Sequence, residues 1–133
     1  MSTTILVTTR EYIDLDFSFA RHPITSNVSI KKTVNSVRQS ILHLMQLKEF
    51  DKPFHPEIKS PVYQYFFENA SAITSIIIES EVKNYLGSYE PRVRIDSVNV
   101  TFPEPNAITC EIIGEIINIQ QPITVNVLIN RLR

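Results

Sequence analysis

The hydrophobic residues in the first half of the chain repeat with a helical period. Residues 29–46 have apolar side chains at spacings of three and four, which form one stripe of a helix: Ile30, Val34, Val37, Ile41, Leu44 and Met45. The polar residues between them, including Arg38 and Gln39, are predicted to face solvent. Asn27 and Ser29 are the candidate caps, because a short polar side chain accepts a hydrogen bond from the first helical turn.

Two further helices are predicted before the chain reaches its second half. Residues 62–69 form a short candidate helix, and residues 73–86 have the apolar spacing of a longer one, with Ser71 as candidate cap. Gly87 is expected to end the longer helix, since glycine readily adopts a positive φ. Between the helices, residues 50–61 contain three prolines and predict an extended connector pinned by its aromatic residues.

Period-two patterns predict strands at both ends of the chain. Near the N-terminus, four apolar residues alternate with polar ones and predict a short, half-buried strand: Ile13, Leu15, Phe17 and Phe19. Beyond residue 92 the alternation changes phase near Asp96 and Ser97, which predicts a bulge. A following strand, 108–119, has apolar residues on both faces and is predicted to be central.

The last strand alternates cleanly between apolar and polar residues and is predicted to lie at an edge of the sheet. These patterns together predict an α+β fold, with about three helices packed on an antiparallel sheet of three to four strands. We expect one domain spanning residues 1–133.

A forced turn connects the helical half to the sheet, within the sequence NYLGSYEPR at residues 84–92. Pro91 lacks a backbone donor and moves Glu90 out of the helical region, so the chain must change direction there. The turn is expected to display Glu90 and Arg92 on either side of a rigid residue. An exposed ion pair of this kind contributes at most about 1 kcal/mol.

Composition argues against several classes of function. Thirteen basic and fourteen acidic residues give a net charge of −1, which provides no field for binding nucleic acid. Two glycines leave no phosphate-binding loop, so no cofactor is expected. One cysteine, no apolar run near 20 residues and no signal-like N-terminus predict a protein without membrane contact, made in a reducing cytoplasm.

Three motifs carry a resemblance to a known family: PFHPEI at residues 53–58, FFEN at 66–69 and YEPR at 89–92. Their order and spacing resemble the small baseplate wedge protein of T-even-type contractile-tailed phages, a family shared with the type VI secretion baseplate. The resemblance extends from about Tyr12 to the final NRLR. It departs at Lys59, where the family usually has glycine.

The resemblance implies a structural role in the tail baseplate of a virion, with assembly in the host cytoplasm. Implied partners are the baseplate wedge core proteins, the tail sheath protein and, beyond them, tail tube or hub proteins. The implied docking corner toward the wedge core is the EPR motif, Glu90, Pro91 and Arg92, which we call the EPR corner. The protein would serve as the platform on which sheath polymerisation starts.

The final strand offers a physical route to that platform role. An open edge strand can accept a strand from another chain through main-chain hydrogen bonds, with alternate side chains setting the register. We expect residues Ile123 to Leu132 to provide this sheath-facing edge, with four alternating residues at its centre: Ile123, Val125, Val127 and Ile129.

A muramidase-like glycosidase is the alternative, because proteins of this family have carried a lysozyme label. Such an enzyme requires two carboxylates across a cleft, one of them with a raised pKa. The available residues are Glu57, Glu68, Glu79, Glu81 and Glu90. No pattern sets two of them opposite each other, so a protein without enzymatic activity is predicted.

Other reactive residues predict no further site. His22, His43 and His55 are far apart in sequence and lack a second ligand at helical spacing, so no metal site is expected. Cys110 lies within a predicted strand and is expected to be a small buried residue rather than a nucleophile. The aromatic residues between positions 50 and 67 lack a basic stripe and are predicted to pack, not to stack on bases.

Overall fold

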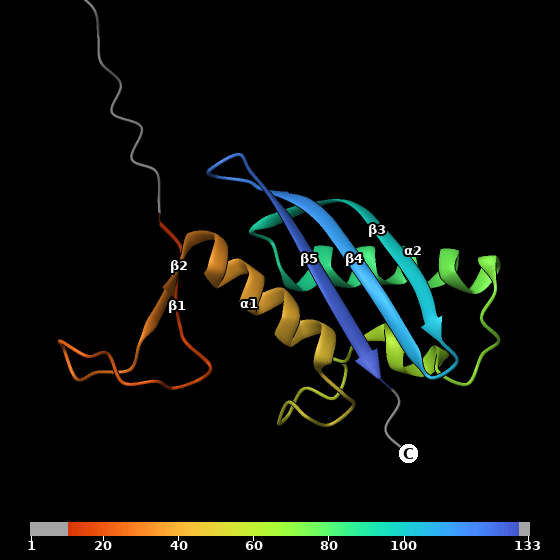
Figure 1. Ribbon diagram of the computed structural model, residues 1–133, viewed down its shortest axis with the longest axis horizontal. Coiled ribbons are helices and arrows are strands. Elements are labelled where there is room, and N and C mark those ends of the chain that lie inside the picture. The colour runs from red at the N-terminus through yellow and green to blue at the C-terminus, as the bar shows by residue number, and fades with distance from the viewer. Residues whose placement is uncertain (1–10, 131–133) are drawn as a thin grey trace, which may run out of the picture.

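The computed structural model describes residues 11–130, which form an α+β fold with two antiparallel sheets (Figure 1). The elements in chain order are β1 (Ile13–Leu15), β2 (Ile30–Lys32), α1 (Thr33–Gln46), the 3-10 turn η1 (Pro61–Tyr65), α2 (Ala72–Tyr89), β3 (Val93–Glu104), β4 (Ala107–Ile116) and β5 (Gln121–Asn130). The described residues contain two α-helices, not about three. Residues 61–65 form only a 3-10 turn, because so short a segment gains too few hydrogen bonds to continue as a helix.

The main sheet has the strand order β3-β4-β5. Helix α2 packs against the edge strand β3, and helix α1 packs against the other edge strand, β5. The prediction that residues 108–119 form a central strand is confirmed by β4. Its second face is open, however: Ile113 is half-buried and Ile117, just beyond the strand, is exposed. The core therefore lies on one side of the sheet.

The predicted bulge near Asp96 is confirmed by a register shift between Ile95 and Ser97 where β3 pairs with β4. Strands β3 and β4 approach each other closely beside this bulge. A Cβ atom placed on Gly114 would lie 2.5 Å from the backbone oxygen of Arg94, so only glycine fits this position.

Helix α1 begins later than predicted. Ile30 belongs to strand β2, and the residue that precedes the helix is Lys32, which makes no capping hydrogen bond with its side chain. The predicted caps Asn27 and Ser29 are therefore wrong. Gln39, predicted to face solvent, is buried because its amide bonds to the chain around β1.

Helix α2 confirms its predicted cap, since the Ser71 hydroxyl accepts a hydrogen bond from the amide of Thr74 at 3.2 Å. The predicted end is wrong: Gly87 has no positive φ, and the helix continues to Tyr89 until Pro91 stops it. The buried side is Ile78, Val82 and Leu86, whereas Ile73, Ile76 and Ile77 are exposed.

The connector after α1 has no regular structure, as predicted, but its aromatic residues do not pin it. Phe50 and Phe54 are exposed, and both have a positive φ, 67° and 65°. Lys59 is not among the residues with positive φ, so its backbone conformation does not require the glycine that the family has there. Its ammonium forms an ion pair with Glu49 at 3.2 Å.

Candidate docking site at the EPR corner

The EPR corner lies between the end of α2 and the start of β3. The amide of Glu90 completes the helix by donating to the carbonyl of Leu86 at 2.8 Å, and Pro91 then turns the chain toward the sheet. The carbonyl of Arg92 accepts from the amide of Ile117 at 3.0 Å, which joins the corner to the end of β4. The corner is therefore fixed by backbone contacts on both sides.

A hydrogen-bonded charge network is centred on the Arg92 side chain. Its Nε and Nη2 atoms donate to the two oxygens of Glu90 at 2.6 and 2.9 Å, a bidentate arrangement. Nη1 donates to Asp14 Oδ2 at 3.0 Å and to Ser36 Oγ at 3.3 Å. Ser36 in turn donates to Asp14 at 2.7 Å. We call these four residues the Arg92 network.

The Arg92 network joins segments that are far apart in the chain. Asp14 lies in β1, Ser36 in the first turns of α1, and Glu90 at the end of α2. The aromatic ring of Tyr12 lies 5.5 Å below the guanidinium, within the range of a cation–π contact. Four parts of the fold therefore meet at one arginine.

The structure does not display Glu90 as the sequence predicted. Only 2% of its surface is exposed, and Arg92 is partly buried, whereas Pro91 is exposed. The prediction missed Asp14 and Ser36 entirely. Asp14 alternates with apolar residues in its strand and Ser36 lies in the first helix, but no sequence pattern indicates that either of them meets Arg92.

The ionisation of these groups follows from their contacts. Partial burial raises the pKa of the Asp14 carboxyl, but hydrogen bonds from Ser36 and Arg92 outweigh it and hold the pKa below its ordinary value of 3.8. The hydrogen bonds with Glu90 are the main cause of the raised pKa of Arg92. At neutral pH the network therefore contains charged Asp14 and charged Arg92.

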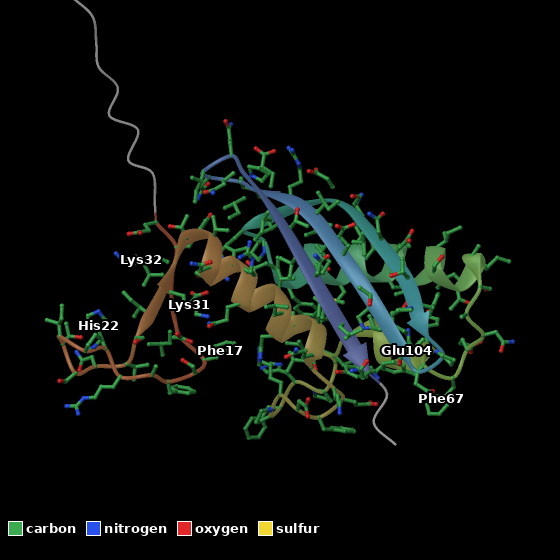
Figure 2. All side chains as sticks on the ribbon, in the orientation of Figure 1. Phe17, His22, Lys31, Lys32, Phe67 and Glu104 are labelled. Carbon is green, nitrogen blue, oxygen red and sulfur yellow. The ribbon has the colours of Figure 1, made fainter. Side chains whose placement is uncertain are left out.

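The β1–β2 hairpin, residues 13–32, extends from the body beyond the N-terminal end of α1 (Figure 1). Ile13 pairs with Lys32 and Leu15 with Ile30, so these residues share one face of the two-stranded sheet. That outer face is solvent-exposed: Ile13 is 52%, Leu15 56% and Ile30 49% exposed. Figure 2 shows Lys31, Lys32 and His22 out on this projection, away from the main sheet.

The other face of the hairpin is polar and meets the Arg92 network. Asp14 pairs with Lys31 across the strands and contacts Arg92. The prediction of a strand from Ile13 to Phe19 with its apolar face buried is therefore wrong, because the apolar face of this segment points to solvent. Only Ile13–Leu15 form the strand, and the exposed Phe19 has a φ of 52°.

A shallow groove lies beside the EPR corner on the side of α2. It has a volume of about 740 Å³ and is lined by residues of α2, the turn and β3, among them Lys83, Gly87, Pro91 and Arg94. A Cβ atom on Gly87 would have no other atom within 4 Å, so the missing side chain leaves this groove open. Exposed Pro91 is part of its wall.

The two edges of the main sheet differ. On the β3 edge, the amide of Val100 donates to Glu79 of α2 at 3.0 Å, and Lys83 of α2 donates to the carbonyl of Asp96 at 3.2 Å. Side chains of α2 therefore occupy backbone groups of that edge. No described residue makes a hydrogen bond to the outer side of β5.

The outward backbone groups of β5 can be identified from the ladder, in which successive residues point alternately to the two sides of a strand. Val100 points away from β4, so its partner Cys110 points toward β5, where it faces Val127. The outward groups then belong to the alternate residues Thr124, Asn126, Leu128 and Asn130. Pro122, two residues before Thr124, also points away from β4, so its missing N–H removes no hydrogen bond between the two strands.

The predicted edge residues Ile123, Val125, Val127 and Ile129 lie in β5, and their side chains are buried in the core. Any contact of this strand with a partner would use backbone groups and the exposed side chains of the alternate residues. Leu132, the predicted end of the segment, lies outside the described residues.

The carboxylates considered for glycosidase chemistry are mostly engaged in the fold. Glu81 accepts from Gln64 at 2.8 Å and from the Tyr65 hydroxyl at 2.7 Å, while Glu79 and Glu90 have the structural roles described above. Glu68 is exposed. None of these arrangements places two carboxylates around an apolar cleft.

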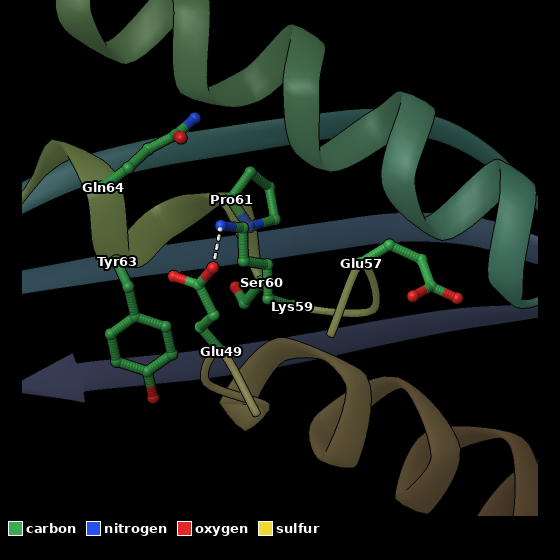
Figure 3. Close-up of a pocket in the computed structure, with 7 residues that line it drawn as sticks. All are labelled: Glu49, Glu57, Lys59, Ser60, Pro61, Tyr63 and Gln64. Atoms are coloured by element: carbon green, nitrogen blue, oxygen red, sulfur yellow. Dashed lines mark ion pairs between the residues drawn. The ribbon is translucent and has the colours of Figure 1, made fainter. Parts of the chain in front are cut away.

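A pocket of about 370 Å³ contains the remaining candidate, Glu57, together with Glu49 (Figure 3). Figure 3 shows the Glu57 carboxylate pointing away from the ion pair of Glu49 with Lys59. A backbone hydrogen bond and a contact with His55 lower the pKa of Glu57. A general acid of a glycosidase requires the opposite shift, so this pocket does not support that chemistry.

Other chemistry finds little support in the described part of the chain. Among residues 11–130, no group of three His, Cys, Asp or Glu side chains could hold a metal ion, and no helix is long and apolar enough to span a membrane. Cys110 is buried, and burial raises the pKa of its thiol to about 12, which opposes a nucleophilic role.

Comparison with known proteins finds a relative by sequence. The chain is 28% identical over 74 residues to baseplate wedge protein gp25 of Enterobacteria phage T4, a segment that covers 56% of each protein. The match thus spans about half the length of that relative. No protein-family model matches the chain.

The fold is shared with a solved structure from Geobacter sulfurreducens, a protein named provisionally as a tail lysozyme. The TM-score is 0.65 and the identity 18%, with 73% of this chain and 89% of that chain covered. At this identity the likeness concerns the fold alone. The sequence match and the shared fold together confirm the resemblance to the gp25-like baseplate wedge proteins that the three motifs predicted.

Proposed function

We propose that this protein is a structural component of a contractile-tail baseplate wedge, located in the virion tail, that docks on the wedge core and starts polymerisation of the tail sheath. The similarity to T4 gp25 supports the baseplate role. The EPR corner, Glu90, Pro91 and Arg92, marks the docking end. Its exposed proline and adjoining groove offer a surface that a wedge protein can occupy.

The observation that carries the sheath role is the difference between the two edges of the main sheet. Side chains of α2 occupy the β3 edge, whereas no hydrogen bond from residues 11–130 reaches the outward backbone groups of β5. A free edge binds an extended segment of another chain by main-chain hydrogen bonds. A strand from the first sheath ring is the occupant we propose for β5.

Proline substitution on β5 tests this role. Asn126→Pro removes an outward N–H while leaving the hydrogen bonds to β4 in place, as Pro122 already does on the same strand. We expect a folded protein that enters baseplates and supports at least about tenfold fewer sheathed tails, counted by electron microscopy, because the lost bond and the ring's bulk break strand pairing.

Asn126→Thr is the matched control, because it changes the same side chain and keeps the amide. Normal sheath growth on baseplates that contain the proline variant would refute strand addition at β5. Val127→Pro serves as the opposite control: its amide points toward β4, so this change is expected to damage the fold itself.

A structural role is favoured over the muramidase alternative by the lowered pKa of Glu57 and by the engagement of Glu79, Glu81 and Glu90 in the fold. The lysozyme name belongs to a protein that shares the fold at 18% identity. We therefore propose no catalytic residue.

A further inference from the structure

We propose that the pocket of Figure 3 binds an arginine side chain of another protein, with Glu49 and Ser60 as the residues that hold its guanidinium group. We call it the Ser60 pocket; residues between positions 49 and 64 line it. Its volume of about 370 Å³ lies at the small end of the range for ligand sites, which suits a single side chain. The proposed docking and sheath roles do not use this pocket, so the inference does not rest on them.

The Ser60 hydroxyl is the observation that points to a ligand. Ser60 is only 3% exposed, and its Oγ atom has no hydrogen-bond partner among residues 11–130. The residue is fixed in place, because its amide donates to the carbonyl of Leu47 at 2.8 Å and Pro61 begins η1 directly after it. Figure 3 shows the hydroxyl between the side chains of Glu49 and Lys59. An unpaired buried hydroxyl destabilises a fold, so its presence calls for a partner from outside the chain.

The charges of the Ser60 pocket favour a cation. Its lining contains two carboxylates, Glu49 and Glu57, and one ammonium, that of Lys59. Lys59 Nζ lies 3.2 Å from Glu49 Oε1, and the two side chains are 44% and 54% exposed. Such an exposed pair is weak, so an incoming cation can take the place of Lys59 beside Glu49. The movement of Lys59 toward solvent would uncover the Ser60 hydroxyl.

A guanidinium group fits these acceptors better than a second ammonium. It has five N–H donors in a planar fork, so it can donate to both oxygens of a carboxylate and still donate to a hydroxyl. The ammonium of Lys59 already pairs with Glu49 and leaves Ser60 without a partner. A ligand that displaces Lys59 must therefore contact Glu49 and Ser60 together, which is the geometry that arginine offers.

The test is an NMR titration of the full chain with a glycine-arginine-glycine peptide that is acetylated and amidated at its ends. We expect saturable shifts in the amides of residues 57–64 at about millimolar peptide, as for a ligand with one anchoring side chain. The same peptide with citrulline, which has the shape of arginine without its charge, should give no saturable shift. Free arginine should bind more weakly than the peptide, because its carboxylate is repelled by the acidic pocket.

Substitutions in the Ser60 pocket should change the affinity in opposite directions. Ser60→Ala removes a hydrogen bond to a charged group and should weaken binding about tenfold. Its melting temperature should equal or exceed that of the wild-type protein, since the lost hydroxyl has no partner in the free protein. Glu49→Gln should also weaken binding, whereas Lys59→Ala removes the competing cation and should strengthen binding about threefold. Glu68→Gln is the matched control for charge, because Glu68 is exposed and does not line the pocket.

Three results would overturn the proposal. If the arginine peptide gives no saturable shift, or if the citrulline peptide binds equally well, the pocket is not a guanidinium site and water satisfies the Ser60 hydroxyl. If Ser60→Ala lowers the melting temperature and leaves the affinity unchanged, the hydroxyl has a structural role. If free arginine binds as tightly as the peptide, the ligand is the amino acid and not a side chain of another protein.

Discussion

The N-terminal hairpin and the main sheet have the same alternation of apolar and polar residues but opposite orientations. In β5 the residues Ile123, Val125, Val127 and Ile129 point into the core, and their polar neighbours point to solvent. In the hairpin, Ile13 and Leu15 point to solvent, while Asp14 points to the body and contacts Arg92. Period-two alternation therefore defines two faces without deciding which of them is buried.

The difference has an energetic consequence. The main sheet is held by many buried side chains, each contributing a modest amount, so its position does not depend on one contact. The hairpin is held mainly by a few hydrogen bonds centred on Arg92 and Gln39. Damage to one charged group should therefore displace the hairpin, whereas the main sheet should respond only to losses in its core.

The largest effect is expected when Arg92 is removed. Arg92→Ala leaves the carboxylate of Glu90 buried without its cation, which costs about 3–5 kcal/mol of unfolding free energy. Urea denaturation monitored by circular dichroism measures this. The control is Arg94→Ala, because Arg94 is exposed and its pairing with Glu115 should contribute at most about 1 kcal/mol. Equal losses in the two variants would contradict the special role of Arg92.

A second pair of variants compares an isoleucine in each region. Ile112→Ala in β4 removes a side chain that is 1% exposed, and the resulting cavity should cost about 2–5 kcal/mol. Ile13→Ala on the hairpin should reduce the unfolding free energy by less than about 1 kcal/mol, since Ile13 is 52% exposed and its removal leaves no enclosed cavity. A large loss for Ile13→Ala would show that the outer face is buried in solution.

The smallest expected effect is a response of the hairpin to acid. The pKa of Asp14 in the folded protein lies below 3.8, so its contribution to stability is present above that pH and is lost as the pH falls through the lower folded value. Hairpin amide signals in NMR spectra should broaden or shift below about pH 4, before those of β4. Asp14→Asn should remove the early change; its persistence in that variant would assign the response to another group.

Several parts of the fold followed from local physical rules. Ser71 caps α2 because its hydroxyl can reach an amide of the first turn, and Pro91 ends that helix because it lacks a donor. The bulge near Asp96 followed from the phase change of apolar residues. By contrast, Gly87 was predicted to end the helix although Pro91, four residues later, is the stronger signal.

The candidate site was predicted only in part. The EPR corner was found from its turn chemistry and motif resemblance, but the burial of Glu90 was not, because burial depends on segments that the chain brings together from far away. Asp14 is 78 residues from Arg92 along the sequence. No local pattern encodes a contact over such a separation.

The sequence NYLGSYEPR by itself determined that the chain turns at Pro91 and that opposite charges flank the turn, since these follow from backbone geometry and covalent order. Only the tertiary structure decided that those charges face inward and hold the hairpin. It also decided which edge of the sheet stays open, because α2 packs against β3 and its side chains reach that edge alone. Both outcomes depend on which surfaces meet when the helices pack on the sheet.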